Sequence, residues 1–172
     1  MSTVLKHLAE YFWKKLFAEK WRKLTLKNTE QCANISLVTV RDLQGTQDRS
    51  ELCVQGGFYD KDGIYYLTYT EDAVTGPGDA RVFLKISKDS VEIRRMGEFK
   101  TVIRYRQGEI TDTLYETPFG KMDIKIRTSK IVNKLSEKGG TLKIFYTLIT
   151  GGEDVKNEIT LDIELRSEEN EV

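Results

Sequence analysis

One arginine stands where the pattern of the chain predicts a buried side chain, which makes it the residue best placed to do chemistry. Arg95 follows Val91 and Ile93 at intervals of two, so on an extended strand the three side chains share one face. A buried arginine has to be paired and hydrogen-bonded. Glu71 shares a face with Leu67 in the same way and is a candidate partner. Two interpretations stay open: an internal ion pair, or an anchor whose planar guanidinium takes a ligand carboxylate or phosphate.

Several tyrosines share the predicted inward face with this arginine. They would line an amphipathic interior, in which Arg95 takes the acidic head group of a small ligand. The candidate ligand-binding set is Arg95, Glu71, Tyr69, Tyr65, Tyr105 and Tyr115.

The residues on which most enzymes depend are scarce in this chain. The single histidine is His7, near the N-terminus, which excludes Ser-His-Asp and multi-histidine metal arrangements from the remainder. Cys32 and Cys53 are too widely spaced for a zinc signature. We therefore predict no catalytic residue, no metal site and no cofactor. Two carboxyl groups that meet inside the fold as acid and base are the open alternative.

Short strands are the elements that would position these side chains. From Glu158 to Arg166 every second residue is aliphatic, which is typical of a strand with one buried face. Turn residues such as Asp62-Gly63 separate runs of this kind. The predicted strands are 35–41, 50–59, 63–71, 81–87, 90–96, 98–106, 110–117, 120–128, 141–150 and 157–166. Residues 130–138 are ambiguous between a short strand and one helical turn.

These strands predict a mainly β fold. Closure into a barrel removes the exposed edges that would otherwise invite aggregation. We therefore expect a single antiparallel β-barrel of about 8–10 strands.

Residues 3–24 have a different period and predict an additional N-terminal amphipathic α-helix. Apolar side chains recur there in two neighbouring stripes, one of which contains Trp13, Phe17 and Trp21. Residues 1–27 hold seven lysines and arginines against two glutamates, a net charge of +5. The helix could pack on the barrel, associate with itself, or contact a protein partner or membrane surface. The predicted domains are 1–32 for helix and linker, 33–167 for the barrel and 168–172 for an acidic tail.

Charge and composition limit the classes of partner. The 27 basic and 27 acidic residues give a formal net charge of zero, which argues against binding to nucleic acid. Two cysteines form no disulfide framework, and no run approaches the roughly 20 apolar residues of a membrane span. The N-terminus lacks the uninterrupted apolar stretch of a signal peptide. We predict a cytoplasmic protein, whose oligomeric state does not follow from the sequence.

Four segments carry a resemblance to a known family. They are 66–71 (YLTYTE), 91–97 (VEIRRMG), 115–120 (YETPFG) and 139–146 (GGTLKIFY). In their order and spacing, over about residues 34–166, the chain resembles the YwiB-like family of small bacterial proteins of unknown function. The resemblance implies a calycin-like, or lipocalin-like, β-barrel in a bacterial cytoplasm, and it implies no activity. The residues that fall on the family pattern are Tyr69, Glu71, Arg95, Gly97, Thr117, Pro118, Phe119 and Gly120.

Two functions fit these observations. The first is a small non-catalytic binding protein that holds an amphipathic or acidic ligand inside the barrel. The second is a filled barrel that acts as an interaction scaffold and contacts a protein partner or membrane surface through its N-terminal helix. The N-terminal helix itself departs from the family pattern.

Overall fold

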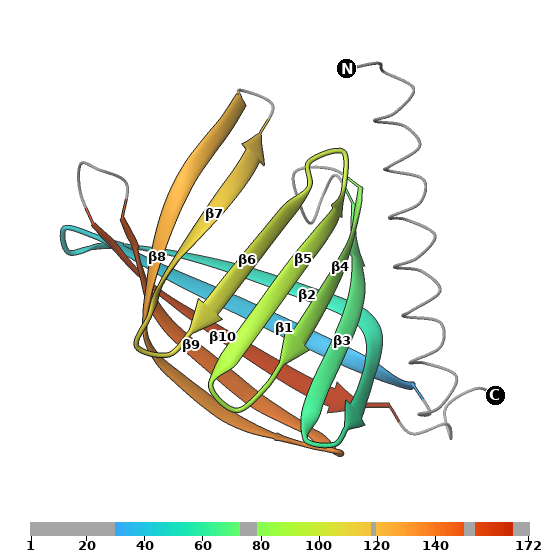
Figure 1. Cartoon of the computed structure of the whole chain (residues 1–172). Coiled ribbons are helices and arrows are strands. Elements are labelled where there is room, and N and C mark those ends of the chain that lie inside the picture. The colour runs from blue at the N-terminus through green and yellow to red at the C-terminus, as the bar shows by residue number, and fades with distance from the viewer. Residues whose placement is uncertain (1–29, 73–78, 118–119, 150–153, 167–172) are drawn as a thin grey trace. The chain divides into compact units, whose positions relative to one another are not determined.

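The structure is a computed structural model that describes residues 30–72, 79–117, 120–149 and 154–166. These residues form ten strands and the turns between them (Figure 1). The strands are β1 (Gln31–Leu43), β2 (Thr46–Lys61), β3 (Ile64–Glu71), β4 (Ala80–Ile86), β5 (Ser90–Gly97), β6 (Thr101–Arg106), β7 (Ile110–Thr117), β8 (Gly120–Ser136), β9 (Gly139–Ile149) and β10 (Val155–Leu165).

The strands form one antiparallel sheet that curls into a nearly closed barrel (Figure 1). The order in the sheet is β6-β5-β4-β3-β2-β1-β10-β9-β8-β7, so β6 and β7 are its two ends although they are consecutive in the chain. No ladder joins these two strands among the described residues. Instead, Glu109 N donates to Arg106 O in the turn, and Thr111 Oγ1 donates to Arg104 O over 2.5 Å. The gap between β6 and β7, which we call the seam, is therefore bridged by a turn hydrogen bond and a side-chain hydrogen bond.

The hairpin turns divide between the two ends of the barrel because successive strands run in opposite directions. The connections after β1, β3, β5, β7 and β9 lie at one end, which we call the mouth. The connections after β2, β4, β6 and β8 lie at the other end, which we call the base.

A bulge in β8 helps to close the base. The register of β8 on β9 shifts between Thr128 and Lys130. The amide of Ile131, just beyond the bulge, donates to Gln107 Oε1 over 2.8 Å. Gly108 N donates to Thr128 O, also over 2.8 Å. The turn between β6 and β7 is thus tied to the bulged strand.

The observed strand boundaries agree with those predicted from the alternation of apolar and polar residues where a strand has one buried face. They differ from the prediction where both faces of a strand are polar. Asp62 and Gly63 form the predicted tight turn, with φ of 55° and 77°. β2 begins well before residue 50, after a turn at Gln44-Gly45 that the alternation does not reveal, because the first residues of β2 are polar and exposed. The ambiguous residues 130–136 continue β8 as a strand.

Alternate side chains from most of the strands fill the barrel with one hydrophobic core. Its largest members are less than about 2% exposed and include aliphatic residues from six strands and one phenylalanine. They are Phe58, Ile35, Leu67, Leu84, Ile86, Leu142, Ile144, Leu161, Val82 and Val91.

The sequence-based fold class needs a correction. It combined the barrel with an N-terminal α-helix, whereas every element of the described residues is a strand. The predicted helix, residues 3–24, lies outside the described residues. The fold is therefore an all-β, nearly closed barrel of ten antiparallel strands over the described chain.

Candidate functional site

The side chains predicted to line a ligand site fall into three separate groups. All of them lie on strands whose alternate residues face the core, but at different heights in the barrel. The groups are Arg95, Glu71 and Tyr69 at the mouth, Tyr65 at the base, and Tyr105 with Tyr115 beside the seam.

Arg95 and Glu71 form an ion pair on the β3–β5 side of the mouth. Arg95 Nε donates to Glu71 Oε2 over 2.8 Å, and Arg95 Nη1 donates to the carbonyl oxygen of Phe99 over 3.2 Å. The two side chains are only 12% and 13% exposed. This is the partner that their shared inward face predicted. A ligand carboxylate would have to displace Glu71 before it could bind the Arg95 fork.

Tyr69 and Gly97 pack around this ion pair. Tyr69 is buried and shares a hydrogen bond with Glu71. Burial, reinforced by the Glu71 carboxylate, raises the pKa of the Tyr69 phenol well above its usual range. A side chain at Gly97 would clash with the carbonyl oxygen of Asp79, so only glycine fits there without a shift of the backbone. Both residues therefore fix the surroundings of the pair.

Tyr65 belongs to the closure of the base. Its hydroxyl donates to the carbonyl oxygen of Leu135 over 3.0 Å, and its ring stacks on Phe58 with centroids 5.8 Å apart. Burial, with the charges of Asp60 and Glu137, raises the pKa of the Tyr65 phenol. A polar depression of about 390 Å³ lies beside it, lined in part by Gln107 and Asn133. These polar groups already bind the barrel's own backbone, since Asn133 Nδ2 donates to Ser87 O over 3.3 Å.

Tyr105 contacts a tyrosine that was not in the predicted set. The rings of Tyr105 and Tyr146 meet edge to face, with centroids 4.9 Å apart and planes at 61°. Their hydroxyl groups share a hydrogen bond, and Tyr115 lies near enough to act on both electrostatically. Burial raises the pKa of both Tyr105 and Tyr146.

Tyr146 belongs to a row of polar side chains that the prediction also missed. In register, Arg41 on β1 stands opposite Asn157 on β10, Asn157 opposite Tyr146 on β9, and Tyr146 opposite Thr128 on β8. The four share the inward face with core residues such as Ile159. The alternation could have found Arg41, because it continues the parity of the inward residues of its strand.

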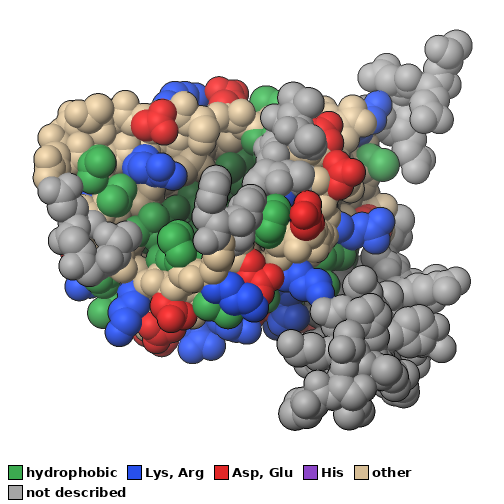
Figure 2. All heavy atoms as spheres, turned by 90° about the horizontal axis from the view of Figure 1, so that it is seen from above, with side chains coloured by type: hydrophobic (Ala, Val, Ile, Leu, Met, Phe, Trp, Pro, Cys, Tyr) green, Lys and Arg blue, Asp and Glu red, His purple; other side chains and the backbone are tan. Residues whose placement is uncertain are grey.

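Burial falls toward the mouth along β1, β2, β8 and β9, whereas Tyr69, Ala80 and Thr101 at the mouth ends of β3, β4 and β6 are buried. On β1 and β9, the inward residues nearer the base are buried, whereas Leu37 and Leu148 are only partly buried. Leu52 on β2 and Ile124 on β8 repeat this gradient. Figure 2 views the barrel from above and shows hydrophobic side chains around a hollow at its centre. The inner wall at the mouth is therefore apolar and partly open.

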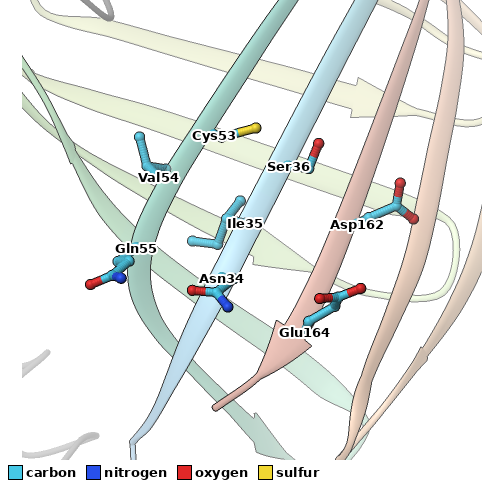
Figure 3. A pocket seen from close by; sticks show the side chains of 8 residues that line it. All are labelled: Asn34, Ile35, Ser36, Cys53, Val54, Gln55, Asp162 and Glu164. Carbon is cyan, nitrogen blue, oxygen red and sulfur yellow. The ribbon is translucent and has the colours of Figure 1, made fainter.

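A second depression lies on the outer face of β2, β1 and β10 (Figure 3). It measures about 430 Å³ and is lined by Asn34, Ser36, Cys53, Gln55, Asp162 and Glu164 and by parts of Ile35 and Val54. Asp162 Oδ1 accepts a hydrogen bond from Thr141 Oγ1 over 2.6 Å, and Cys53 is an exposed free thiol. These side chains stand side by side on a sheet surface and do not converge on a common point (Figure 3).

The remaining predicted contacts lie outside the described residues. Trp13, Phe17 and Trp21, proposed to contact a partner or membrane, belong to this part of the chain, as do Pro118 and Phe119 of the family pattern. Within the described ranges, no cluster of three or more His, Cys, Asp or Glu residues could hold a metal ion. The same ranges contain no helix of the length and hydropathy that a membrane span requires.

Comparisons with known proteins place the chain in a group without an assigned activity. The family described as a domain of unknown function (DUF1934) matches residues 35–163. The uncharacterized beta-barrel protein YwiB of Bacillus subtilis is 30% identical over 109 residues, which are 63% of this chain and 75% of that protein. The crystal structure of the ywiB protein from Bacillus subtilis matches with a TM-score of 0.71 at 26% identity, and the match covers 80% of this chain and 94% of that one. The resemblance predicted from the four segments is confirmed.

Proposed function

The chain belongs to the family defined by this domain of unknown function, and from its own geometry we propose that it is a small, non-catalytic binding protein whose barrel holds an amphipathic ligand. The observation that carries the proposal is the burial gradient of the inner wall. Leu37, Leu52, Ile124 and Leu148 face inward at the mouth but are only partly buried.

An apolar ligand would complete the burial of this wall. Each methylene group removed from water contributes about 0.8 kcal/mol, so a short chain or ring system supplies enough free energy for binding. At the base, Tyr65 donates a hydrogen bond to Leu135 O and Gln107 accepts one from Ile131 N, so we place the ligand entrance at the mouth. Tyr105 and Tyr146 would present hydroxyl groups to such a ligand.

A matched pair of variants tests this proposal. Leu37→Trp adds a bulky ring to the inner wall, whereas Val38→Trp adds the same ring to the outer face of the same strand. We expect native mass spectrometry of freshly purified wild-type protein to show an added mass that denaturing extraction releases. The added mass should be lost in Leu37→Trp and kept in Val38→Trp. A bare wild-type mass, together with no binding of octanoate or 1-octanol in calorimetry, would contradict the proposal.

A second candidate function rests on the sequence of residues 3–24. The two apolar stripes and the net charge of +5 favour contact with an acidic membrane surface or a protein partner. In the full-length protein, Phe17→Glu combined with Trp21→Glu should abolish sedimentation with phosphatidylglycerol vesicles. Val38→Trp should leave sedimentation unchanged. Wild-type protein that stays in the supernatant would remove the membrane version of this candidate.

We also propose that the protein works in the cytoplasm. Cys32 and Cys53 are both exposed and unbridged. Free thiols at the surface suit a reducing compartment.

A further inference from the structure

The polar row crosses four neighbouring strands, from Arg41 near the mouth end of β1 to Thr128 in the middle of β8. Arg41, Asn157, Tyr146 and Thr128 stand opposite one another in register on β1, β10, β9 and β8. Apolar residues flank the row on β9 and β10: Leu148, two positions from Tyr146 toward the mouth, is partly buried, and Ile144 and Ile159 on the base side are buried. The inner wall therefore changes from apolar to polar and back within a few residues.

Two members of the row have hydrogen-bonding capacity that the described residues leave unused. Thr128 is 0% exposed, and its Oγ1 has no hydrogen-bond partner among the described residues. A buried hydroxyl without a partner is uncommon and points to a bound water or ligand group. Asn157 is 6% exposed and donates through Nδ2 to the carbonyl oxygen of Val155 over 2.8 Å, and its Oδ1 faces no donor identified in the described chain.

Arg41 differs from Arg95 in its pairing. Arg95 is bound to Glu71, whereas Arg41 forms no ion pair among the described residues. Asp48 stands opposite Arg41 on β2, but the two side chains form no ion pair either. Arg41 shares the inward parity of β1 with Ile35 and Leu37, and its positive charge partly offsets the raised pKa of the Tyr146 phenol.

We propose that Arg41, with Asn157, Tyr146 and Thr128, forms the subsite for the acidic end of the ligand, and that this ligand is a small amphipathic carboxylate. The inference rests on the proposed binding function and names its ligand class. Arginine offers a planar fork that matches a carboxylate, and the neighbouring amide and hydroxyl groups supply further donors. The apolar part of the ligand lies against Leu37, Leu148 and their neighbours.

A ligand pair matched in chain length tests this assignment. Octanoate and 1-octanol differ only in the head group, so isothermal titration calorimetry on both separates head-group recognition from burial of the chain. We expect Arg41→Gln to weaken octanoate binding about tenfold or more, as the loss of a charge-assisted hydrogen bond implies, and to leave 1-octanol binding unchanged. Tyr146→Phe, which keeps the ring, should weaken octanoate binding by a smaller factor.

Two controls make the result specific. Arg49→Gln removes an exposed arginine of β2 that pairs with Glu51, and it should change neither affinity. Urea unfolding of each variant without ligand shows whether Arg41→Gln leaves the fold intact, as expected for an exposed side chain.

The outcomes distinguish this inference from the proposed function. Equal losses for octanoate and 1-octanol in Arg41→Gln, or no loss for either, would overturn the head-group subsite while the binding function stands. Wild-type protein that binds neither compound and carries no extractable ligand would overturn both.

Discussion

The ion pair between Arg95 and Glu71 yields the sharpest prediction about stability. Both side chains are nearly buried, at 12% and 13% exposed, and Nε lies 2.8 Å from the carboxylate. Removing one partner of such a pair leaves a charge that is poorly solvated, which costs about 3–5 kcal/mol. Because some exposure and the hydrogen bond from Tyr69 remain, we expect about 3 kcal/mol for Arg95→Met.

The same reasoning predicts that the two residues are not independent. Glu71→Leu alone should also cost about 3 kcal/mol, because it removes the carboxylate that pairs with the nearly buried Arg95 guanidinium. The double variant Arg95→Met/Glu71→Leu removes both charges and should cost about 1–2 kcal/mol, far less than the sum. The coupling energy would then be about 4 kcal/mol.

Equilibrium unfolding in urea measures these differences, with a constant slope as the sign of a two-state transition. For a domain of this size, about 3 kcal/mol corresponds to a fall in Tm of roughly 6–12 °C. Arg49→Gln is the matched control, since Arg49 and Glu51 are 62% and 51% exposed and their pair should contribute below about 1 kcal/mol. Additive single-variant costs near 6 kcal/mol in the double variant would refute the argument, because the two charges would then act separately.

Three further predictions concern packing, closure and pH. Gly97→Ala should lower the Tm in thermal unfolding, because its Cβ would clash with a backbone carbonyl oxygen; an unchanged Tm would contradict this. Gln107→Leu should cost about 1–3 kcal/mol in urea unfolding, because it leaves the amide of Ile131 without its acceptor; a cost near zero would show that water replaces the side chain. Burial raises the pKa of Tyr105, so the folded state keeps a proton that the unfolded state loses, and stability should be fully present below pH of about 10 and fall above it; a Tyr105→Phe variant whose stability falls as steeply above that pH would contradict this.

From the sequence we could predict which side chains face into the barrel better than how far each one lies from the mouth or the base. Parity placed Arg95 and Glu71 on one inward face, and they form an ion pair. Parity also grouped Tyr65 with Tyr69, yet one closes the base and the other supports the mouth, because residues four positions apart on a strand lie about 13 Å apart. Which inward residues meet depends on the register of neighbouring strands, which alternation alone does not determine.

The departures of the structure from the alternation have physical causes. The bulge after Thr128 interrupts the alternation of β8: even-numbered residues face inward before it, and odd-numbered residues such as Ile131 and Leu135 face inward after it. Residues 130–138 therefore looked ambiguous in the sequence. The tip of the β1–β2 hairpin is polar on both faces, so no apolar period marks its turn at Gln44. Arg41 was missed because it is the last residue of a predicted strand, where an arginine side chain is usually expected to point into solvent.

The polar side chains of the barrel differ in what they bind, and this difference argues for a ligand at the polar row. At the base, Tyr65, Gln107 and Asn133 bind backbone groups of the barrel itself, so their hydrogen bonds stabilise the fold directly. In the polar row, Arg41 forms no ion pair and Thr128 Oγ1 has no hydrogen-bond partner among the described residues. A barrel that served only as a filled scaffold would gain nothing from a partly exposed apolar wall interrupted by such a row. A barrel that binds an amphipathic carboxylate needs both, because the apolar wall supplies affinity and the polar row selects the head group.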